Sequence, residues 1–199
     1  MDEVPSDERD LVEAAKSGSE VAFSELTARY YERVYHIAYR ILDSVEDAEE
    51  VTQETFARAV IALERFDHRA TFFTWIVSIA RNAAFDQLRA KKRRARLYSV
   101  EDGFENMAVD GASGPVTATS DSEAAAIVRK ALTRLNERDR TLLVLREYEN
   151  MQYEEIARVM KCSIGTIESG IHRARKKLKY FLQALDPARD GIESKVKAS

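Results

Sequence analysis

Seven lysine or arginine residues and a single acid lie between Thr71 and Arg96, so this segment carries a local charge of +6. Clustered cations bind polyanions because contact with phosphates releases condensed counterions. Phe72, Phe73 and Trp75 open the same segment, and exposed aromatic rings can stack on unpaired bases. The composition therefore indicates a nucleic-acid surface. A solvated charged face over a packed aromatic core is the alternative.

Apolar residues recur at helical spacing from Trp75 to Leu88, which predicts one long helix with a packed face. The polar residues between them are expected to lie largely outward, because helical periodicity separates the two faces. These candidate nucleic-acid contacts are Arg81, Asn82, Asp86, Arg89, Lys92 and Arg93.

A second basic block follows a helix-turn-helix pattern. A short helix is expected from Gln152 to Met160, then a turn, then a final helix capped by Ser163. The second helix of such a motif enters the major groove of DNA. Any tight pair of amphipathic helices gives a similar pattern, so the motif alone does not prove DNA binding. The groove-facing candidates are Thr166, Glu168, Ser169, His172, Arg173 and Lys176, with Arg175, Lys177 and Lys179 directed at phosphates.

An acidic helix is predicted between these features and the N-terminus. Residues 43–54 contain six acids and no base, and Asp47, Glu50 and Glu54 are expected to form an outer acidic ridge. The ridge is either a solvated surface or a docking site for a basic partner helix. The docking interpretation adds apolar contact from two neighbours, Val51 and Phe56.

The elements that must position these residues are all expected to be helical. The three prolines lie near the two ends and at position 115, so the long segments between them can be uninterrupted helix. Residues 99–123 contain three of the seven glycines, six acids and no Lys or Arg, which indicates a flexible acidic linker. We therefore predict an all-α chain of two small helical domains, the second a helix-turn-helix. The predicted boundaries are 1–98 and 122–186 for the domains, 99–121 for the linker and 187–199 for a disordered tail.

Composition excludes several classes of protein. One cysteine, Cys162, cannot form an internal disulfide, and the three histidines offer no zinc-ligand spacing. The N-terminus is acidic, and no apolar run is long enough to span a bilayer. A net charge of −3 argues against a simple DNA-coating protein. We expect a cytoplasmic protein without a bound metal or cofactor.

In combination, three motifs resemble the extracytoplasmic-function (ECF) sigma factors, the small two-domain class of the sigma-70 family. DAEEVTQETFARA resembles their helix that binds core RNA polymerase. TFFTWIVSIARNAAFDQLRAKKRR resembles their promoter-melting segment, and YEEIARVMKCSIGTIESGIHRARKKL resembles their minus-35 reader. The three occur in the family's order, separated by an acidic linker, and the resemblance covers about Asp10 to Leu182.

The resemblance implies partners and roles. Asp47, Glu50, Gln53 and Glu54 would lie against the clamp helices of the polymerase's largest subunit. Arg81, Asn82 and Asp86 would surround the minus-10 strand, where a base leaves the stack, and Arg89, Lys92 and Arg93 would hold its backbone. The family also implies promoter DNA and an anti-sigma factor as partners. It implies no covalent chemistry, no cofactor, no small-molecule substrate and no insertion into the membrane.

The chain departs from the family pattern at Glu168 and Gly170, where relatives commonly carry basic residues. The recognition helix is therefore expected to lose positive charge at its groove-facing turn. Glu168 could instead accept a hydrogen bond from a cytosine amino group, and the sequence does not decide between weaker binding and altered specificity.

Two other functions are compatible with parts of the sequence. A sigma-like decoy that occupies an anti-sigma factor would keep the packed cores while losing DNA contacts. A metal-dependent nuclease would use the acids of residues 43–54, but no histidine or second acidic cluster completes such a site.

Overall fold

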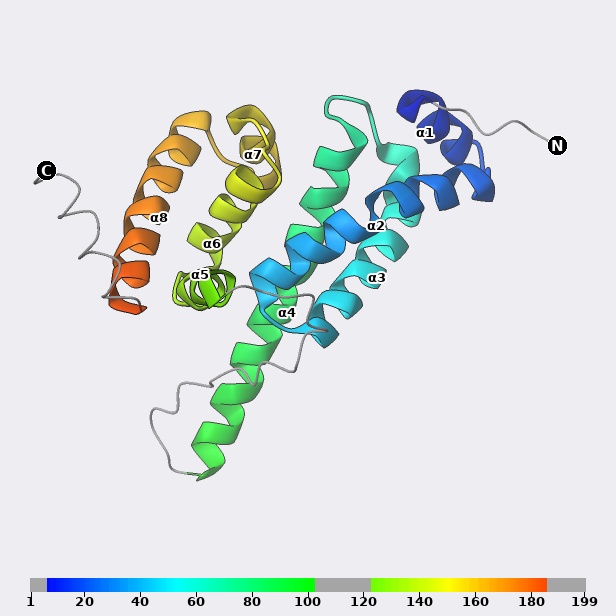
Figure 1. The fold of residues 1–199 in the computed structure, drawn as a ribbon. Helices are drawn as coiled ribbons and strands as arrows, with labels where there is room; N and C mark the ends of the chain where they lie inside the picture. The colour runs from blue at the N-terminus through cyan, green and yellow to red at the C-terminus, as the bar shows by residue number, and fades with distance from the viewer. Residues whose placement is uncertain (1–6, 103–122, 186–199) are drawn as a thin grey trace, which may run out of the picture. The chain divides into compact units, whose positions relative to one another are not determined.

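The computed structural model describes residues 7–102 and 123–185, with side chains for residues 7–97 and 123–185. All regular elements in these ranges are helical, and no strand occurs in them. The helices group into two compact units, α1 to α4 and α5 to α8 (Figure 1). The predictions of an all-α chain and of two helical domains are confirmed. Most of the predicted linker and the whole predicted tail lie outside the described residues.

The first unit contains the acidic helix and the long basic helix of the sequence analysis. Side chains of Asp7, Ser19 and Ser44 each accept a backbone N–H at the start of a helix, as N-capping residues do. The elements are α1 (Glu8–Lys16), α2 (Glu20–Leu42), α3 (Val45–Ala62), the 3₁₀ turn η1 (Leu63–Arg65) and α4 (Phe72–Asp102).

The aromatic residues at the start of α4 belong to the core of this unit. Phe72 is 1% exposed and Phe73 is 8% exposed. The ring of Trp75, which is half-buried, lies 5.1 Å from that of Phe66 and 5.5 Å from that of Phe72. These rings are therefore not a stacking platform for bases, and the packed-core alternative is confirmed for them.

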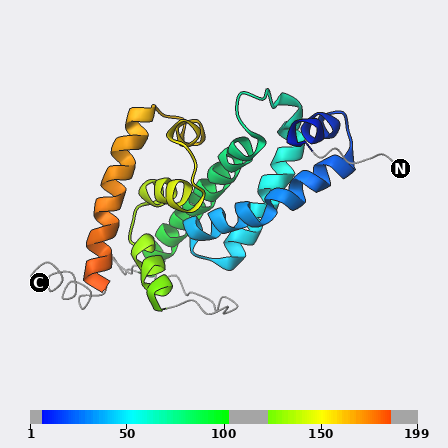
Figure 2. The same cartoon turned by 45° about the horizontal axis from the view of Figure 1, so that its top comes forward.

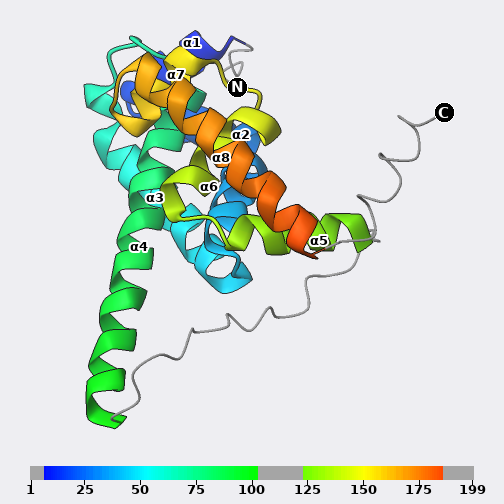
Figure 3. The same ribbon diagram turned by 90° about the vertical axis from the view of Figure 1, so that its left-hand side faces the viewer.

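Helix α4 is longer than the sequence indicated. It runs through Asp102, whereas the linker was predicted to begin at residue 99. Its C-terminal part extends past the ends of α2 and α3 (Figure 3), and residues 91–97 are all exposed. This part of α4 therefore receives little packing support from its own unit.

The second unit contains the helix-turn-helix. The final helix α8 is the longest of the unit and runs beside α5 and α6 (Figure 2). Asn136 caps α6 by accepting the N–H of Asp139 at 2.8 Å. The elements are α5 (Glu123–Thr133), α6 (Glu137–Leu143), the π-helical turn η2 (Val144–Tyr148), α7 (Tyr153–Met160) and α8 (Ile164–Leu185). The predicted helix-turn-helix is confirmed.

The close approach of α8 to α6 requires a glycine. Gly170 is buried, and a Cβ at this position would lie 2.7 Å from Cδ1 of Leu142, which is itself fully buried. Gly170 therefore faces the core of the unit. The expectation that Gly170 lies in the groove-facing turn is wrong, because a Cβ at this position points at Leu142 of α6 and would require that side chain to shift.

Candidate functional site

Three predicted contact residues of the acidic helix α3 are buried. Asp47 is only 7% exposed, and Val51 and Phe56 are 1% and 7% exposed. The prediction of an outward ridge is therefore wrong for Asp47. Val51 and Phe56 lie in the core and offer no apolar surface for docking.

The outer face of α3 combines polar and apolar residues. Glu50, Gln53 and Glu54 are exposed as predicted. Val60 is 52% exposed and Ile61 82% exposed at the C-terminal end of the same helix. The sequence analysis missed these two, although Gln53 and Ile61 are eight positions apart and therefore share a face.

Two residues of α4 bind the start of α3. The amide Nε2 of Gln87 donates to Oδ1 of Asp47 at 3.2 Å and to Oε2 of Glu50 at 2.9 Å. The ammonium of Lys91 forms an ion pair with the other carboxylate oxygen of Asp47. Burial raises the pKa of the Asp47 carboxyl, but hydrogen bonds from Lys91, Ser44 and Gln87 outweigh it and hold the pKa below its usual value.

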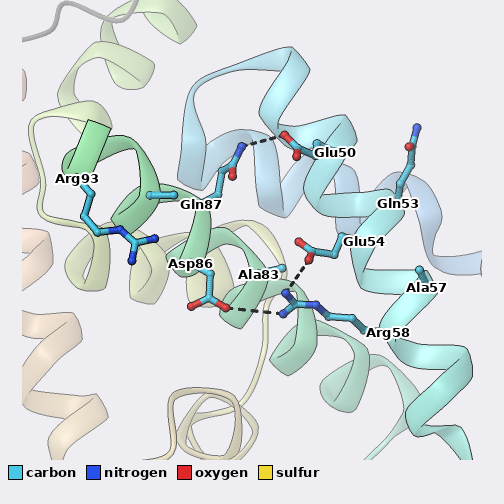
Figure 4. A pocket seen from close by; sticks show the side chains of 10 residues that line it. Glu50, Gln53, Glu54, Ala57, Arg58, Ala83, Asp86, Gln87 and Arg93 are labelled. Carbon is cyan, nitrogen blue, oxygen red and sulfur yellow. Dashed lines mark hydrogen bonds and ion pairs between the residues drawn. The ribbon is translucent and has the colours of Figure 1, made fainter. Parts of the chain in front are cut away.

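A second polar connection lies one turn further along α3. The guanidinium of Arg58 donates to Oε1 of Glu54 at 2.6 Å and lies 3.7 Å from Oδ2 of Asp86. Asp86 is also 3.3 Å from Nη1 of Arg89. Glu54, Arg58 and Asp86 line an open groove between α3 and α4 (Figure 4). The groove has a volume of about 620 Å³, and Gln53 and Arg93 also line it. The groove brings residues of both predicted sites of this unit together.

The candidates on α4 differ in exposure. Arg81 and Asn82 are half-buried, whereas Asp86, Arg89, Lys92 and Arg93 are exposed. The exposed cations continue along residues 91–97, so α4 presents a positively charged surface where a polyanion could bind.

Helix α8 presents most of its predicted readers to solvent. Ser163 caps the helix by accepting the N–H of Thr166 at 3.3 Å. Thr166 is half-buried. The remaining groove-facing candidates are exposed: Glu168, Ser169, His172, Arg173 and Lys176.

Two cationic side chains of α8 form ion pairs with acidic residues of the same unit. Arg175 donates from Nε and Nη2 to Oε1 of Glu147, at 2.9 and 2.6 Å, and this hydrogen bond is the main cause that raises the pKa of its guanidinium. Lys177 donates to Oδ2 of the buried Asp139 at 2.5 Å. Both were predicted to reach phosphates, but in this structure they connect α8 to η2 and α6.

No group of His, Cys, Asp and Glu side chains in the described residues has an arrangement that could hold a metal ion. Among the described helices, none combines the length and apolar character needed to cross a membrane.

Comparison with known families identifies the class of protein. The model for sigma-70 region 2 matches residues 26–94, which include α3 and the packed part of α4. The model for sigma-70, region 4, matches residues 125–178, which contain the helix-turn-helix. The two matched ranges therefore correspond to two regions of the sigma-70 family, one in each unit.

Individual relatives narrow the class. The RNA polymerase sigma-H factor of Pseudomonas aeruginosa is 36% identical over 183 residues, covering 89% of this chain and 95% of the relative. The ECF RNA polymerase sigma-E factor of Escherichia coli is 35% identical over 180 residues, covering 88% and 94%. The chain belongs to the extracytoplasmic-function sigma factors.

Solved structures agree with this assignment. The structure of CnrH in complex with the cytosolic domain of CnrY matches with a TM-score of 0.67 and 29% identity, over 89% of this chain and 97% of that one. The sigma factor RpoE of Bartonella quintana, in complex with the anti-sigma factor NepR, also gives a TM-score of 0.67, with 25% identity over 81% and 96%.

Proposed function

We propose that this sigma factor binds core RNA polymerase through the outer face of α3 and reads promoter DNA through α4 and α8. The observation that carries the proposal is the arrangement of α3. Its exposed residues Glu50, Gln53 and Glu54 are continuous with two exposed apolar residues, Val60 and Ile61. A polar rim beside exposed apolar side chains is the composition of a protein interface. The partner at this face would be the clamp helices of the polymerase's largest subunit.

The DNA-reading surfaces are assigned by charge and exposure. On α4, Asn82 and Asp86 would lie at the unpaired minus-10 strand, with Arg89, Lys92 and Arg93 on its backbone. On α8, Glu168, Ser169, His172, Arg173 and Lys176 would face the minus-35 major groove, with Thr166 at its edge. The function is binding rather than catalysis, because binding energy at the minus-10 strand offsets the cost of unpairing.

The relatives suggest a regulatory partner and a cellular location for this chain. One structural neighbour is bound to an anti-sigma factor, and we propose a similar partner for this chain. We also propose that it acts in the cytoplasm, where core polymerase and promoters are present.

Run-off transcription with purified core polymerase on fragmented genomic DNA tests the proposal. Wild type should give specific transcripts, and Asn82→Ala should lose them because the strand-opening surface is damaged. Glu168→Arg should change the set of promoters used if Glu168 reads a base. Core binding without any transcript on any template would contradict the initiation role and support the decoy.

The burial of Gly170 weakens the case for the decoy alternative. It depended on Glu168 and Gly170 as lost DNA contacts, but Gly170 faces Leu142 in the core. Glu168 alone remains as a departure, and one carboxylate is also compatible with sequence readout.

A further inference from the structure

The groove between α3 and α4 contains an arginine that contacts acids of both proposed surfaces. Nη2 of Arg58 donates to Oε1 of Glu54 at 2.6 Å, and Nη1 of the same guanidinium lies 3.7 Å from Oδ2 of Asp86 (Figure 4). Glu54 is a proposed polymerase contact, whereas Asp86 is a proposed minus-10 contact. In the sequence, Arg58 follows Glu54 by four positions and has the spacing of an ordinary surface ion pair, so its contact with α4 is visible only in the fold.

The row of contacts continues along α4. Oδ1 of Asp86 lies 3.3 Å from Nη1 of Arg89, which is proposed to hold the backbone of the minus-10 strand. Each oxygen of the Asp86 carboxylate therefore faces a different arginine. Glu54, Arg58, Asp86 and Arg89 form a row of alternating charge, the charge relay, which leads from the polymerase face to the DNA face.

The contacts of the charge relay are unequal and weak enough to exchange. The guanidinium of Arg58 is within hydrogen-bond distance of Glu54 but only within ion-pair distance of Asp86. The side chains are 42% exposed for Arg58, 44% for Glu54, 56% for Asp86 and 71% for Arg89. Exposed ion pairs are weak, because water screens them. A further charge brought to one end of the relay is therefore expected to redistribute its contacts.

We propose that Arg58 is a positioning residue that couples polymerase binding on α3 to DNA binding on α4. A cationic side chain of the polymerase at Glu54 would repel the guanidinium of Arg58 and shift it toward Asp86. Asp86, paired more closely with Arg58, would then release Arg89 to a phosphate. The inference rests on the proposed functions of α3 and α4, and it adds that the two are linked.

Thermodynamic linkage makes this coupling measurable from either side. If polymerase binding favours the state in which α4 binds DNA, DNA must raise the affinity for polymerase by the same factor. Because exposed ion pairs contribute little, the charge relay should supply about two- to fivefold of that factor.

Titration of the full-length chain with core polymerase measures the coupling factor. It is the dissociation constant without DNA divided by that with a saturating oligonucleotide, which carries the minus-10 strand of a promoter found by run-off transcription. Arg58→Gln should lower this factor about two- to fivefold. Arg29→Gln is the matched control, because Arg29 forms the same i,i+4 pair with Glu25 on α2, and the factor should not change. If Arg58 only stabilised the fold or contacted one partner, the individual affinities would change and the factor would not.

A second variant tests the path of the coupling. Glu54→Gln removes the acid at the polymerase end of the charge relay and should lower the coupling factor as well. The double variant Glu54→Gln/Arg58→Gln should lower it no further than the stronger single change, since both changes interrupt one path. Losses that add would show that Arg58 does not act through Glu54.

Urea denaturation of the free chain tests the contacts without any partner. Double-mutant cycles of Arg58→Gln with Glu54→Gln and with Asp86→Asn should each give a favourable interaction. A coupling factor unchanged by Arg58→Gln overturns the inference even if polymerase and DNA both bind, as does a cycle with Asp86 that shows no interaction. If wild type binds neither core polymerase nor the oligonucleotide, the proposed function fails, while the cycles still decide whether Arg58 joins α3 to α4.

Discussion

Two glycines of α8 have opposite surroundings. A Cβ at Gly170 would meet Leu142 at 2.7 Å, whereas a Cβ at Gly165 would have nothing within 4 Å. Gly170→Leu should lower the free energy of unfolding by about 1–3 kcal/mol, because it overpacks the contact with α6. Gly165→Leu should leave it unchanged or raise it by up to about 1 kcal/mol, since leucine favours helix more than glycine does. Urea denaturation of both variants checks this, and equal effects would contradict the close approach.

The ion pair of Arg175 with Glu147 limits the charge that α8 can offer to DNA. Glu147→Gln should free the guanidinium for a phosphate, so that DNA binding strengthens and depends more steeply on salt, by about one additional released counterion. Glu154→Gln removes the same charge from an exposed position of α7 and is the control. Fluorescence titrations of the holoenzyme on a minus-35 duplex at several salt concentrations measure both slopes. Equal slopes for the two variants would show that Arg175 stays bound within the unit.

Residue types predicted the surfaces better than they predicted individual partners. The exposed readers of α8 follow from helical periodicity, and the N-cap at Ser163 follows from its side-chain hydroxyl. The contacts of Lys91 and Arg175 do not, because a basic residue in a basic run gives no sign of which acid it will meet. The same is true of Asp47. Its place in the first turn of α3 predicts a favourable interaction with the helix dipole, but nothing in the sequence predicts that it is buried against α4.

At the scale of elements, the outer face of α3 predicts which residue should matter for polymerase binding. Ile61 is 82% exposed, so Ile61→Ser should leave the fold stable. If Ile61 is buried in the complex, the change should weaken affinity for core polymerase about tenfold or more, since full burial of such a side chain contributes about 1.5–3 kcal/mol. Val21→Ser is the control, because Val21 is 62% exposed on α2. Equal affinities of the two variants in a competition assay would show that this end of α3 lies outside the interface with polymerase.

The contact of α3 with α4 also predicts a dependence of stability on pH. The folded-state pKa of Asp47 is lowered, so its stabilising contribution is present above the unfolded-state value of about 3.9 and is lost as pH falls through the folded pKa. Asp47→Asn should lower the free energy of unfolding at neutral pH by about 1–3 kcal/mol, and by progressively less below about pH 4. Urea denaturation across this range measures the difference. A difference that stays constant with pH would mean that the charge of Asp47 does not stabilise the fold.

Element boundaries were predictable where a side chain caps the start of a helix. Ser19, Ser44 and Asn136 cap helices as hydrogen-bonding side chains do, and the turn before α8 follows from Ser163. The end of α4 was not predictable from composition, since the helix continues through Asp102 into a segment without Lys or Arg. Helical backbone bonds propagate locally, so a change in side-chain charge does not by itself stop a helix.

For the whole molecule, charge segregation matters more than net charge. The chain has a net charge of −3, yet α4 and α8 carry concentrated positive charge on exposed surfaces. If the proposed surfaces of α4 and α8 both contact a promoter, recognition depends on the two units being joined in one chain. The sequence predicted the two units from the composition of residues 99–123, because a segment rich in acids and glycine offers little apolar surface for a core.

A protease site inserted between residues 103 and 122 tests this dependence in the full chain. Each unit has its own buried core, so cleavage should leave the thermal unfolding of both units almost unchanged. Transcription from promoters with a minus-35 element should fall sharply, because a tether can give the second unit an effective concentration of up to about millimolar, far above that of a free fragment. Uncleaved protein with the same insertion is the control for the insertion itself. Full transcription after complete cleavage at submicromolar protein would show that the minus-35 reader does not depend on its connection to the first unit.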